Sequence, residues 1–339
     1  MNKGSFLTFH NKEEQEMKEK IKIGIIGIGI VGTPLKRWFL EKGRERGKNL
    51  FCYDADPKKG FYDDISKTNV VFICVPTPPN PDGSCNASIV ESVIAQLPDG
   101  ERCIVIKSTV PPGTTEKLRK KYKSKGYFLF NPEFLTEAQA WEDFIRPDRQ
   151  IVAAADEDSR KWISVVLNLL PIGSFQSPGI DGTYNFHEVN STEAELAKYA
   201  GNNFGALKVA FFNTVYDRCK LLGVDYDKVR LLVTHDRRIN GAWTDVNHGG
   251  FRGYAGFCFP KDSDATIAQD EDHLKTLREK GDNFAEVFEK GANLLKAKRD
   301  YNEALLKSQR FTVEKISVHD KDLKKIIKNH NSKERKKNG

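Results

Sequence analysis

The stretch "KIGIIGIGIVGTPLKRWFLEKG", residues 22–43, decides the fold of the N-terminal half of this chain. An apolar run, a glycine-rich loop and a helical pattern follow one another directly, and Gly43 is the expected end of the helix. The glycines form G-x-G-x-x-G at Gly27, Gly29 and Gly32. In such a loop the first glycine permits a tight turn and the second lets the backbone approach a pyrophosphate. The third lets the helix pack closely against the strand.

An acidic residue supports the reading of this loop as a dinucleotide site. Asp54 closes the next expected strand, residues 49–56, and lies about 22 positions beyond Gly32. A carboxylate there accepts hydrogen bonds from a ribose diol and repels a 2′-phosphate, which favours NAD over NADP. The alternative is a structural glycine turn in an α/β protein that binds another ligand, and the position of Asp54 favours the cofactor.

Short apolar segments alternate with helical ones through the first half of the chain. Further strands are expected at residues 69–76, 102–109, 127–134 and 150–155, and helices at residues 87–100 and 113–126. Strands that are apolar on both faces and alternate with helices predict an α/β fold with a doubly wound parallel sheet of the Rossmann type.

The pattern changes near residue 190. Residues 191–223 carry a nearly unbroken helical pattern, which is typical of a helix that links domains or packs at a dimer seam. Further helices are expected at residues 225–234 and 260–310, so the second domain is predicted to be all-helical. The residues that keep helical spacing on the expected buried face are Leu196, Tyr199, Asn203, Leu207, Ala210 and Phe211.

The expected organisation has four parts. A polar extension (residues 1–20) precedes an NAD-binding domain (residues 21–188). A helical central domain (residues 189–310) and a basic tail (residues 311–339) follow.

Composition excludes several classes of protein. The chain has 339 residues, of which 39% are hydrophobic and 30% are charged, with a formal net charge of +7. The excess positive charge is local to residues 321–339, which are expected to be a solvated end rather than a nucleic-acid site. The sequence has neither a run long enough for a membrane helix nor a secretory signal. Six scattered cysteines without a C-x-x-C pair favour reduced thiols in the cytoplasm, and no metal site is expected.

A second conspicuous stretch is "GYAGFCFPKDSDA", residues 253–265. A lone cysteine is more often a buried small hydrophobe than a nucleophile. Cys258, however, follows a glycine-rich loop that lets the backbone approach a ligand. The ammonium of Lys261 would lower the pKa of the thiol. Asp262 lies one turn away if Pro260 opens a helix.

Two other segments offer companions to this cysteine. In "NPEFLTEA", Asn131 and Pro132 predict a helix start, which would put Glu133 and Glu137 on one face. Ordinary first-turn acids that answer the helix dipole would look the same. In the long helical stretch, Lys198 and Asn202 are also four apart, on a polar stripe that could equally be a solvated face.

Taken together, these segments resemble the UDP-glucose/GDP-mannose dehydrogenase family. The matching stretches include "GIIGIGIVG", "VVFICVPTP", "IVIKSTVPPGTT", "NPEFLTEAQAWEDFIRPDRQIVA", "EAELAKYAGNNFGALKVAFFN", "DRRI" and "GYAGFCFPKD". They occur in the order of the family over roughly residues 22–310. The resemblance implies a cytoplasmic homodimer that uses two NAD to oxidise the C6 alcohol of a nucleotide sugar, UDP-glucose above all, to a carboxylate. A cysteine thiohemiacetal and thioester would be the intermediates.

The resemblance also implies roles for individual residues. The cysteine would be the nucleophile, Lys198 would stabilise the oxyanion, and Asn202 would hydrogen-bond the sugar or the oxyanion. Asp262 and Thr109 would hold the water and the lysine, and Glu133 would be the general base. The implied catalytic residues are Cys258, Lys198, Asn202, Asp262, Thr109 and Glu133. Those implied for the cofactor are Gly27, Gly29, Ile30, Val31, Asp54, Pro76, Thr77, Thr109, Glu137 and Lys261. Those implied for the substrate are Glu133, Leu135, Lys198, Asn202, Arg238, Gly253 and Cys258, of which Arg238 would reach the substrate of the neighbouring subunit.

The sequence departs from the family pattern in three places. It is expected to be a short form that lacks the third, nucleotide-gripping domain. Only about fifteen residues separate Asp54 from the next strand, so the cofactor domain is compacted. Ala255 and Phe257 stand near the cysteine where smaller residues are usual. Two other functions therefore stay open: an inactive homologue that acts as a binding or dimerisation partner, and a two-electron hydroxyacid-type dehydrogenase.

Overall fold

The computed structural model describes residues 21–177, 189–247 and 249–337. The expected N-terminal extension, residues 1–20, lies outside them. The chain divides into two compact units. We call Met1–Pro78 with Asn86–Lys198 the sheet unit, and Pro79–Cys85 with Tyr199–Gly339 the helical unit.

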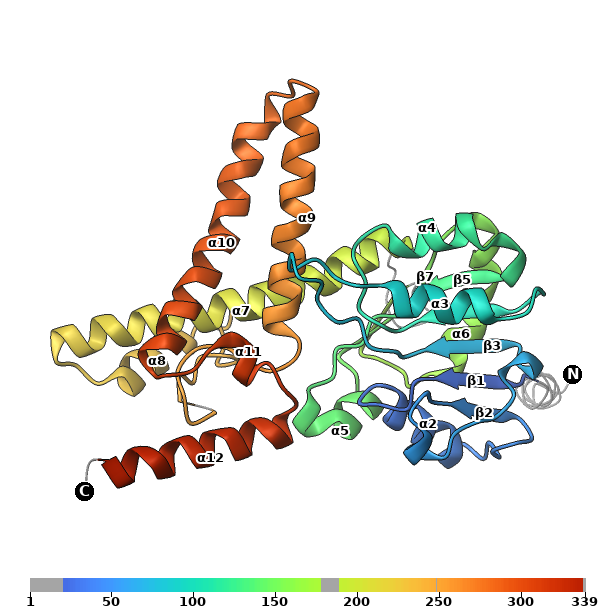
Figure 1. Ribbon diagram of the computed structural model, residues 1–339, viewed down its shortest axis with the longest axis horizontal. Helices are drawn as coiled ribbons and strands as arrows, with labels where there is room; N and C mark the ends of the chain where they lie inside the picture. The colour runs from blue at the N-terminus through green and yellow to red at the C-terminus, as the bar shows by residue number, and fades with distance from the viewer. Residues whose placement is uncertain (1–20, 178–188, 248, 338–339) are drawn as a thin grey trace, which may run out of the picture. The chain divides into compact units, whose positions relative to one another are not determined.

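The sheet unit contains a six-stranded sheet in the order β2-β1-β3-β4-β5-β7 (Figure 1). The first five strands are parallel, which confirms the predicted doubly wound sheet, and β7 adds an antiparallel edge. The strands are β1 (Ile23–Ile26), β2 (Leu50–Tyr53), β3 (Val70–Ile73), β4 (Cys103–Ile106), β5 (Tyr127–Phe130) and β7 (Ala153–Ala154). Because strand order reverses between β1 and β3, the loops after these two strands lie at the switch point where such sheets bind ligands.

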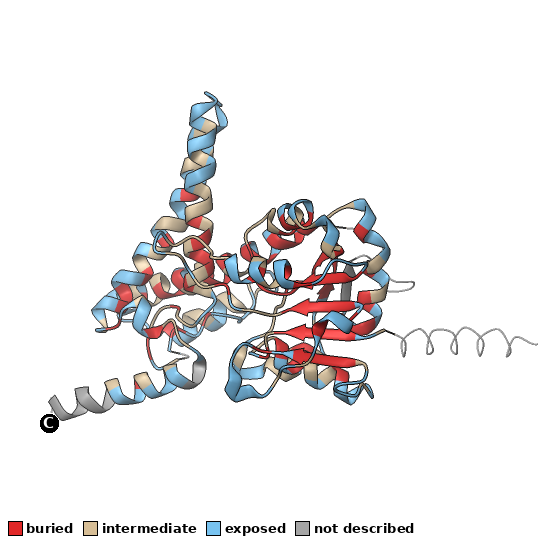
Figure 2. Cartoon of the chain, turned by 45° about the vertical axis from the view of Figure 1, so that its right-hand side comes forward, coloured by how far each residue is buried: buried red, intermediate tan, exposed pale blue. Residues whose placement is uncertain are grey.

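Helices cover both faces of this sheet, and alternate strand residues feed two separate cores. In β4, Cys103 and Val105 face one core while Ile104 and Ile106 face the other. The strands are accordingly buried along most of their length (Figure 2), with Tyr53 at the end of β2 exposed. One face is covered by α2 (Gly32–Glu41), α5 (Ala140–Ile145) and α6 (Ile163–Leu169), and the other by α3 (Ser88–Gln96) and α4 (Thr114–Lys121).

The segment expected as one strand over residues 150–155 is two short strands. β6 (Arg149–Ile151) pairs in parallel with β8 (Phe175–Ser177) in a separate two-stranded sheet. β7 instead pairs with β5. The apolar run is continuous in sequence, but its two halves bond to different partners.

Long helices make up most of the helical unit. α7 (Ser191–Leu222) is the long continuous helix that the unbroken pattern predicted. It begins in the sheet unit and continues into the helical unit. α9 (Phe259–Glu279) and α10 (Phe284–Ser308) form an antiparallel hairpin (Figure 1). The remaining helices are α8 (Tyr226–Thr234), α11 (Val313–Ile316) and α12 (Asp320–Lys337). Across the described ranges, none of the helices has both the length and the apolar character required to span a bilayer.

Two predictions for this half of the chain hold only in part. Of the residues expected on the buried face of α7, Tyr199, Asn203 and Ala210 are buried, but Leu196 and Phe211 are 57% exposed. The end expected to be solvated, residues 321–339, is exposed or partly exposed at most of its described positions, but Ile327 of α12 is buried in a small core. That core contains Phe251, Phe311, Ile316 and Ile327. The many basic residues of α12 made its apolar residues, which recur at helical spacing, easy to overlook in the sequence.

Candidate active site

The loop after β1 fits a dinucleotide. Gly27 has φ +92, and a Cβ there would lie 2.5 Å from the carbonyl oxygen of Cys74. A Cβ at Gly32 would collide with the carbonyl oxygen of Gly27. At Gly29, by contrast, a Cβ would meet nothing within 4 Å. Two of the glycines are thus required by the packing of the chain itself. Gly29 has open space beside it, through which a cofactor phosphate would approach.

Asp54 closes this loop from the end of β2. Its Oδ2 accepts hydrogen bonds from the backbone N–H of Ile28 (2.7 Å) and from Nζ of Lys59 (2.8 Å), and its Oδ1 accepts from the N–H of Asp56 (2.9 Å). Burial opposes ionisation, but these bonds hold the pKa of the Asp54 carboxyl below its usual range. The carboxylate is therefore a charged acceptor suited to a ribose diol. Sequence reasoning missed Lys59, whose only signal is its position five residues after Asp54.

The segments after β3 and β4 are tied together. Thr77 Oγ1 donates to the carbonyl oxygen of Thr109 (2.8 Å), and Ser108 Oγ donates to that of Val75 (2.7 Å). Thr77 is buried, whereas Pro76 is exposed. Two of the predicted cofactor residues thus share one hydrogen bond at the carboxyl ends of neighbouring strands.

The helix predicted to start at Asn131 does not form there. Residues 131–136 are not helical, and a 3-10 turn begins only at Glu137. The Asn131 side chain is buried and bonds elsewhere: Oδ1 accepts from Lys107 Nζ (2.7 Å), and Nδ2 donates to the carbonyl oxygen of Ile151 (2.6 Å). Because these long-range bonds occupy the side chain, it does not cap a helix. Glu133 and Glu137 therefore do not share a helix face.

Glu133 has a buried cation as its partner. Lys107 Nζ lies 3.1 Å from Glu133 Oε2, with 2% of the lysine side chain and 15% of the glutamate side chain exposed. Glu133 Oε1 accepts the N–H of Phe134 (2.9 Å). The carboxylate is thus oriented at both oxygens. Lys107 was missed because a lysine at the end of an apolar strand looks like an ordinary strand end.

Lys198 approaches the same loop. It is 7% exposed, and its Nζ lies 5.2 Å from the ring centroid of Phe134. Leu135, the predicted substrate residue, follows Phe134 and is half-buried. Within the sheet unit, the structure therefore brings Lys198 to the loop that carries Glu133.

The helical unit holds the thiol. Cys258 is exposed at the N-cap of α9. Lys261 Nζ lies 2.6 Å from Asp262 Oδ1, and Asn202 Nδ2 donates to Asp262 Oδ2 (2.5 Å). Asp262 is 1% exposed, so both of its oxygens are committed in a buried site. Burial alone would lower the pKa of Lys261, but the neighbouring Asp262 carboxylate raises it above the usual value. A stable ammonium therefore lies three residues from the thiol.

Glycines allow the close packing around this segment. A Cβ at Gly205 of α7 would lie 2.6 Å from the ring of Phe259, the residue after the cysteine. A Cβ at Gly253, which has φ +104, would lie 2.6 Å from Oδ1 of Asn302. Gly253 is therefore required by packing, whatever its part in substrate binding. Arg238, after α8, is exposed and lies 2.6 Å from Asp236.

Comparison with known proteins yields two family matches. Residues 59–169 match the NAD binding domain of the UDP-glucose/GDP-mannose dehydrogenase family, and residues 192–279 match its central domain. Together the two matches cover more than half of the chain.

Individual relatives agree with these matches. A UDP-glucose 6-dehydrogenase of Pseudomonas aeruginosa is 36% identical over 219 residues, which cover 61% of this chain and 46% of that protein. One of Rhizobium meliloti is 33% identical over 300 residues (76% of this chain and 65% of that protein). The structure of a UDP-glucose dehydrogenase from Pyrobaculum islandicum matches with a TM-score of 0.66 at 28% identity, over 85% of this chain and 69% of that one. The chain thus spans from about half to about two thirds of the length of these curated relatives.

Proposed function

Because the chain belongs to the UDP-glucose/GDP-mannose dehydrogenase family, we propose that it is an NAD-dependent nucleotide-sugar dehydrogenase. The proposed reaction is the four-electron oxidation of the C6 alcohol of a nucleotide sugar, UDP-glucose foremost, to the carboxylate. The observation that carries this proposal is the exposed thiol of Cys258 at the start of α9, beside the buried Lys261–Asp262–Asn202 cluster. A hydroxyacid dehydrogenase has no need of such a thiol.

The order of bonds formed and broken follows from the thiol. Removal of a hydride and a proton from the C6 alcohol gives an aldehyde, and the Cys258 thiolate adds to it as a thiohemiacetal. Loss of a second hydride and a proton gives a thioester. Water then cleaves the thioester to the carboxylic acid and restores the thiol. Bound NAD supplies the hydride acceptor in each oxidation.

The residues of the chain have separate tasks in this scheme. Lys198 and Asn202, one turn apart on α7, stabilise the oxyanion of each tetrahedral species. Glu133, oriented by Lys107, accepts a proton from the hydrolytic water. Asp262 orients both Lys261 and Asn202 through its two oxygens.

The cofactor contacts are assigned to the loop after β1 and to the strand ends around it. The loop at Gly29 admits the pyrophosphate, and Asp54 accepts hydrogen bonds from the ribose diol. Lys59, which is ion-paired with Asp54, is assigned to the same ribose. Thr77 and Thr109 take the nicotinamide side.

Stoichiometry tests the proposal. Purified protein is incubated with excess NAD and limiting UDP-glucose, then with GDP-mannose and N-acetylated UDP-sugars. We expect two NADH per sugar consumed and a uronate as product. One NADH with an aldehyde or ketone product would instead indicate a two-electron dehydrogenase. NAD binding without turnover of any of these sugars would indicate an inactive partner protein.

A serine at the position of the nucleophile tests the covalent steps. We expect Cys258→Ser to stop after the first oxidation or to retain the sugar as a covalent ester, because an alkoxide leaves far less readily than a thiolate. Intact-mass measurement after incubation detects the ester, and a rapid-quench assay counts the NADH formed in the first turnover. Turnover at the wild-type rate would refute the mechanism.

A further inference from the structure

A buried lysine in the helical unit has no part in the reaction proposed above. Lys298 of α10 is 4% exposed. Its Nζ donates to Oδ1 of Asn203 (2.8 Å) and to Oγ of Ser263 (2.8 Å), both of them neutral acceptors. Burial lowers the pKa of the Lys298 ammonium to about 8. An apolar side chain would fill this place without that electrostatic cost, so the ammonium calls for a specific explanation.

The two acceptors adjoin the Asn202–Asp262 pair in sequence. Asn203 follows Asn202 on α7, and Ser263 follows Asp262 on α9. The ammonium therefore links the two helices one residue away from the 2.5 Å bond between Asn202 and Asp262.

The contact with Lys298 also fixes the amide of Asn203. Because Oδ1 accepts from the lysine, Nδ2 must donate, and it lies 2.8 Å from Oγ1 of Thr266 and 3.1 Å from the carbonyl oxygen of Tyr199. Three helices, α7, α9 and α10, are thus joined through one hydrogen-bonded cluster. Rotation of α7 against α9 would break several of these bonds at once.

α10 also forms hydrogen bonds with the loop that precedes Cys258. Asn302, one turn beyond Lys298, accepts the N–H of Tyr254 (2.8 Å) and donates to its carbonyl oxygen (3.1 Å). Gln309, the C-cap residue of α10, makes the corresponding pair of bonds with Arg252 (2.7 and 2.9 Å). α10 therefore holds both the loop that leads to Cys258 and the helices that carry Asn202 and Asp262.

We propose that Lys298 is a positioning residue of the dehydrogenase reaction, which holds Asn202 and Asp262 in register by binding their neighbours Asn203 and Ser263. The inference rests on the proposed function. The lysine touches neither substrate nor cofactor and acts through the cluster alone. Its loss is therefore expected to impair the chemical step and to leave cofactor binding intact.

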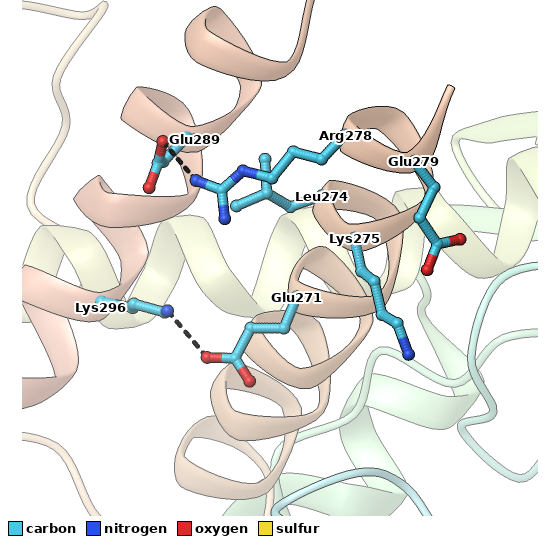
Figure 3. Close-up of a pocket in the computed structure, with 7 residues that line it drawn as sticks. All are labelled: Glu271, Leu274, Lys275, Arg278, Glu279, Glu289 and Lys296. Atoms are coloured by element: carbon cyan, nitrogen blue, oxygen red, sulfur yellow. Dashed lines mark ion pairs between the residues drawn. The ribbon is translucent and has the colours of Figure 1, made fainter. Parts of the chain in front are cut away.

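The test compares two lysines of α10. Lys298→Met keeps the unbranched side chain up to the position of Cε and removes the ammonium. We expect kcat with the nucleotide sugar to fall by about ten- to one hundredfold, while KM for NAD stays within about twofold. The control is Lys296→Met, which removes an exposed ion pair with Glu271 in the groove between α9 and α10 (Figure 3). We expect wild-type kinetics from the control.

A second variant separates positioning from charge and from loss of fold. Ser263→Ala removes one acceptor and leaves the ammonium in place, so kcat should fall in the same direction by a smaller factor. A purely structural role would lower the unfolding midpoint and the yield of active enzyme in both variants without changing kcat per folded molecule. Unchanged kcat in folded Lys298→Met or in Ser263→Ala would overturn the inference.

One readout does not depend on the sugar. Cys258 lies at the N-cap of α9 and interacts electrostatically with Lys261, so alkylation of Cys258 by iodoacetamide at neutral pH should slow by about threefold when the first turn of α9 is displaced in Lys298→Met and in Ser263→Ala. Lys296→Met should react like wild type. If the wild-type chain oxidises no nucleotide sugar, the proposed function fails, and this rate still decides the role of Lys298: equal rates in all four proteins would refute it.

Discussion

At the scale of single residues, Lys107, the lysine that orients Glu133, is the best position in the sheet unit at which to test the proposed site by substitution. Lys107 is almost fully buried and contacts both Glu133 and Asn131. Lys107→Met would remove the cation that pairs with Glu133. The Glu133 carboxylate, whose side chain is only 15% exposed, would then be buried without a partner charge. We expect the free energy of unfolding to fall by about 3 kcal/mol. Turnover should fall further than the loss of folded enzyme explains, because the general base is no longer oriented.

A surface pair in the same unit provides the control for this prediction. Lys121 pairs with Glu91 at 2.5 Å, with 60% and 37% of the two side chains exposed. Lys121→Met should leave both the urea midpoint and the turnover nearly unchanged, since exposed ion pairs contribute little. Equal urea midpoints for Lys107→Met and Lys121→Met would show that the buried pair does not stabilise the fold as expected.

The residues that sequence could and could not identify differ in one physical respect. Cys258, Lys261 and Asp262 lie within five positions of one another, so their motif is readable without a structure. Lys107 and Lys298 depend on partners 26 and 95 positions away, as the contacts with Glu133 and Asn203 show. A single sequence contains no pairing rule for such contacts, and both lysines look like ordinary charged residues.

At the scale of elements, α4 owes its start to a side chain from another helix. Its N-cap is Gly113, which has no side chain to cap the free N–H groups. Glu195 of α7 acts as the capping side chain instead. Its oxygens accept hydrogen bonds from the N–H of Gly113 (2.6 Å), the N–H of Thr115 (2.9 Å) and Oγ1 of Thr115 (2.5 Å). The first turns of the long helix are thereby fixed in the sheet unit, three residues before Lys198.

This contact predicts a pH dependence of stability. Burial raises the pKa of Glu195 to about 7, above its value in the unfolded chain. A raised pKa stabilises the fold fully below the unfolded value near 4.5, and that stabilisation is lost as the pH rises through 7. Glu195→Gln cannot titrate. The difference in unfolding free energy between wild type and Glu195→Gln should therefore shrink by about 3 kcal/mol from pH 4.5 to 8.

Urea unfolding of the two proteins at several pH values measures this difference directly. The comparison cancels the other carboxylates, such as Asp54 and Asp156, whose lowered pKa values produce the opposite slope in both proteins. A difference that grew with pH would mean that the helix N-terminus of α4 holds Glu195 ionised despite its burial.

Sequence predicted elements well where the signal was a repeated pattern and poorly where it was a local cap or a charge count. The five parallel strands follow from short runs of apolar residues, and α7 follows from a long stretch with helical spacing. The helix expected at Asn131 failed because the side chain bonds to Lys107 and Ile151 instead of capping. The net charge of residues 321–339 gave no sign that Ile327 packs into a small core with Phe311 and Ile316.

At the scale of the whole molecule, the exposed apolar residues of the helical unit point to self-association. Phe204 and Phe211, seven apart on α7, are 61% and 57% exposed, and Leu221 and Leu232 nearby in sequence are 86% and 81% exposed. Large apolar side chains gathered on one pair of helices mark a protein interface more often than a free surface. We therefore expect the homodimer that the family resemblance implies, formed through α7 and α8.

Charge substitutions test this interface. Phe211→Glu and Leu232→Lys should each turn a dimer into a monomer in sedimentation velocity. In a two-fold symmetric interface each substitution buries one unpaired charge from each of the two subunits. Leu294→Lys, at a residue of α10 that is 56% exposed, is the matched control and should leave the dimer intact. If Arg238 reaches the substrate of the neighbouring subunit, the monomeric variants should also show a raised KM for the nucleotide sugar with unchanged NAD binding. A wild-type monomer, or dimers in all variants, would refute the proposed interface.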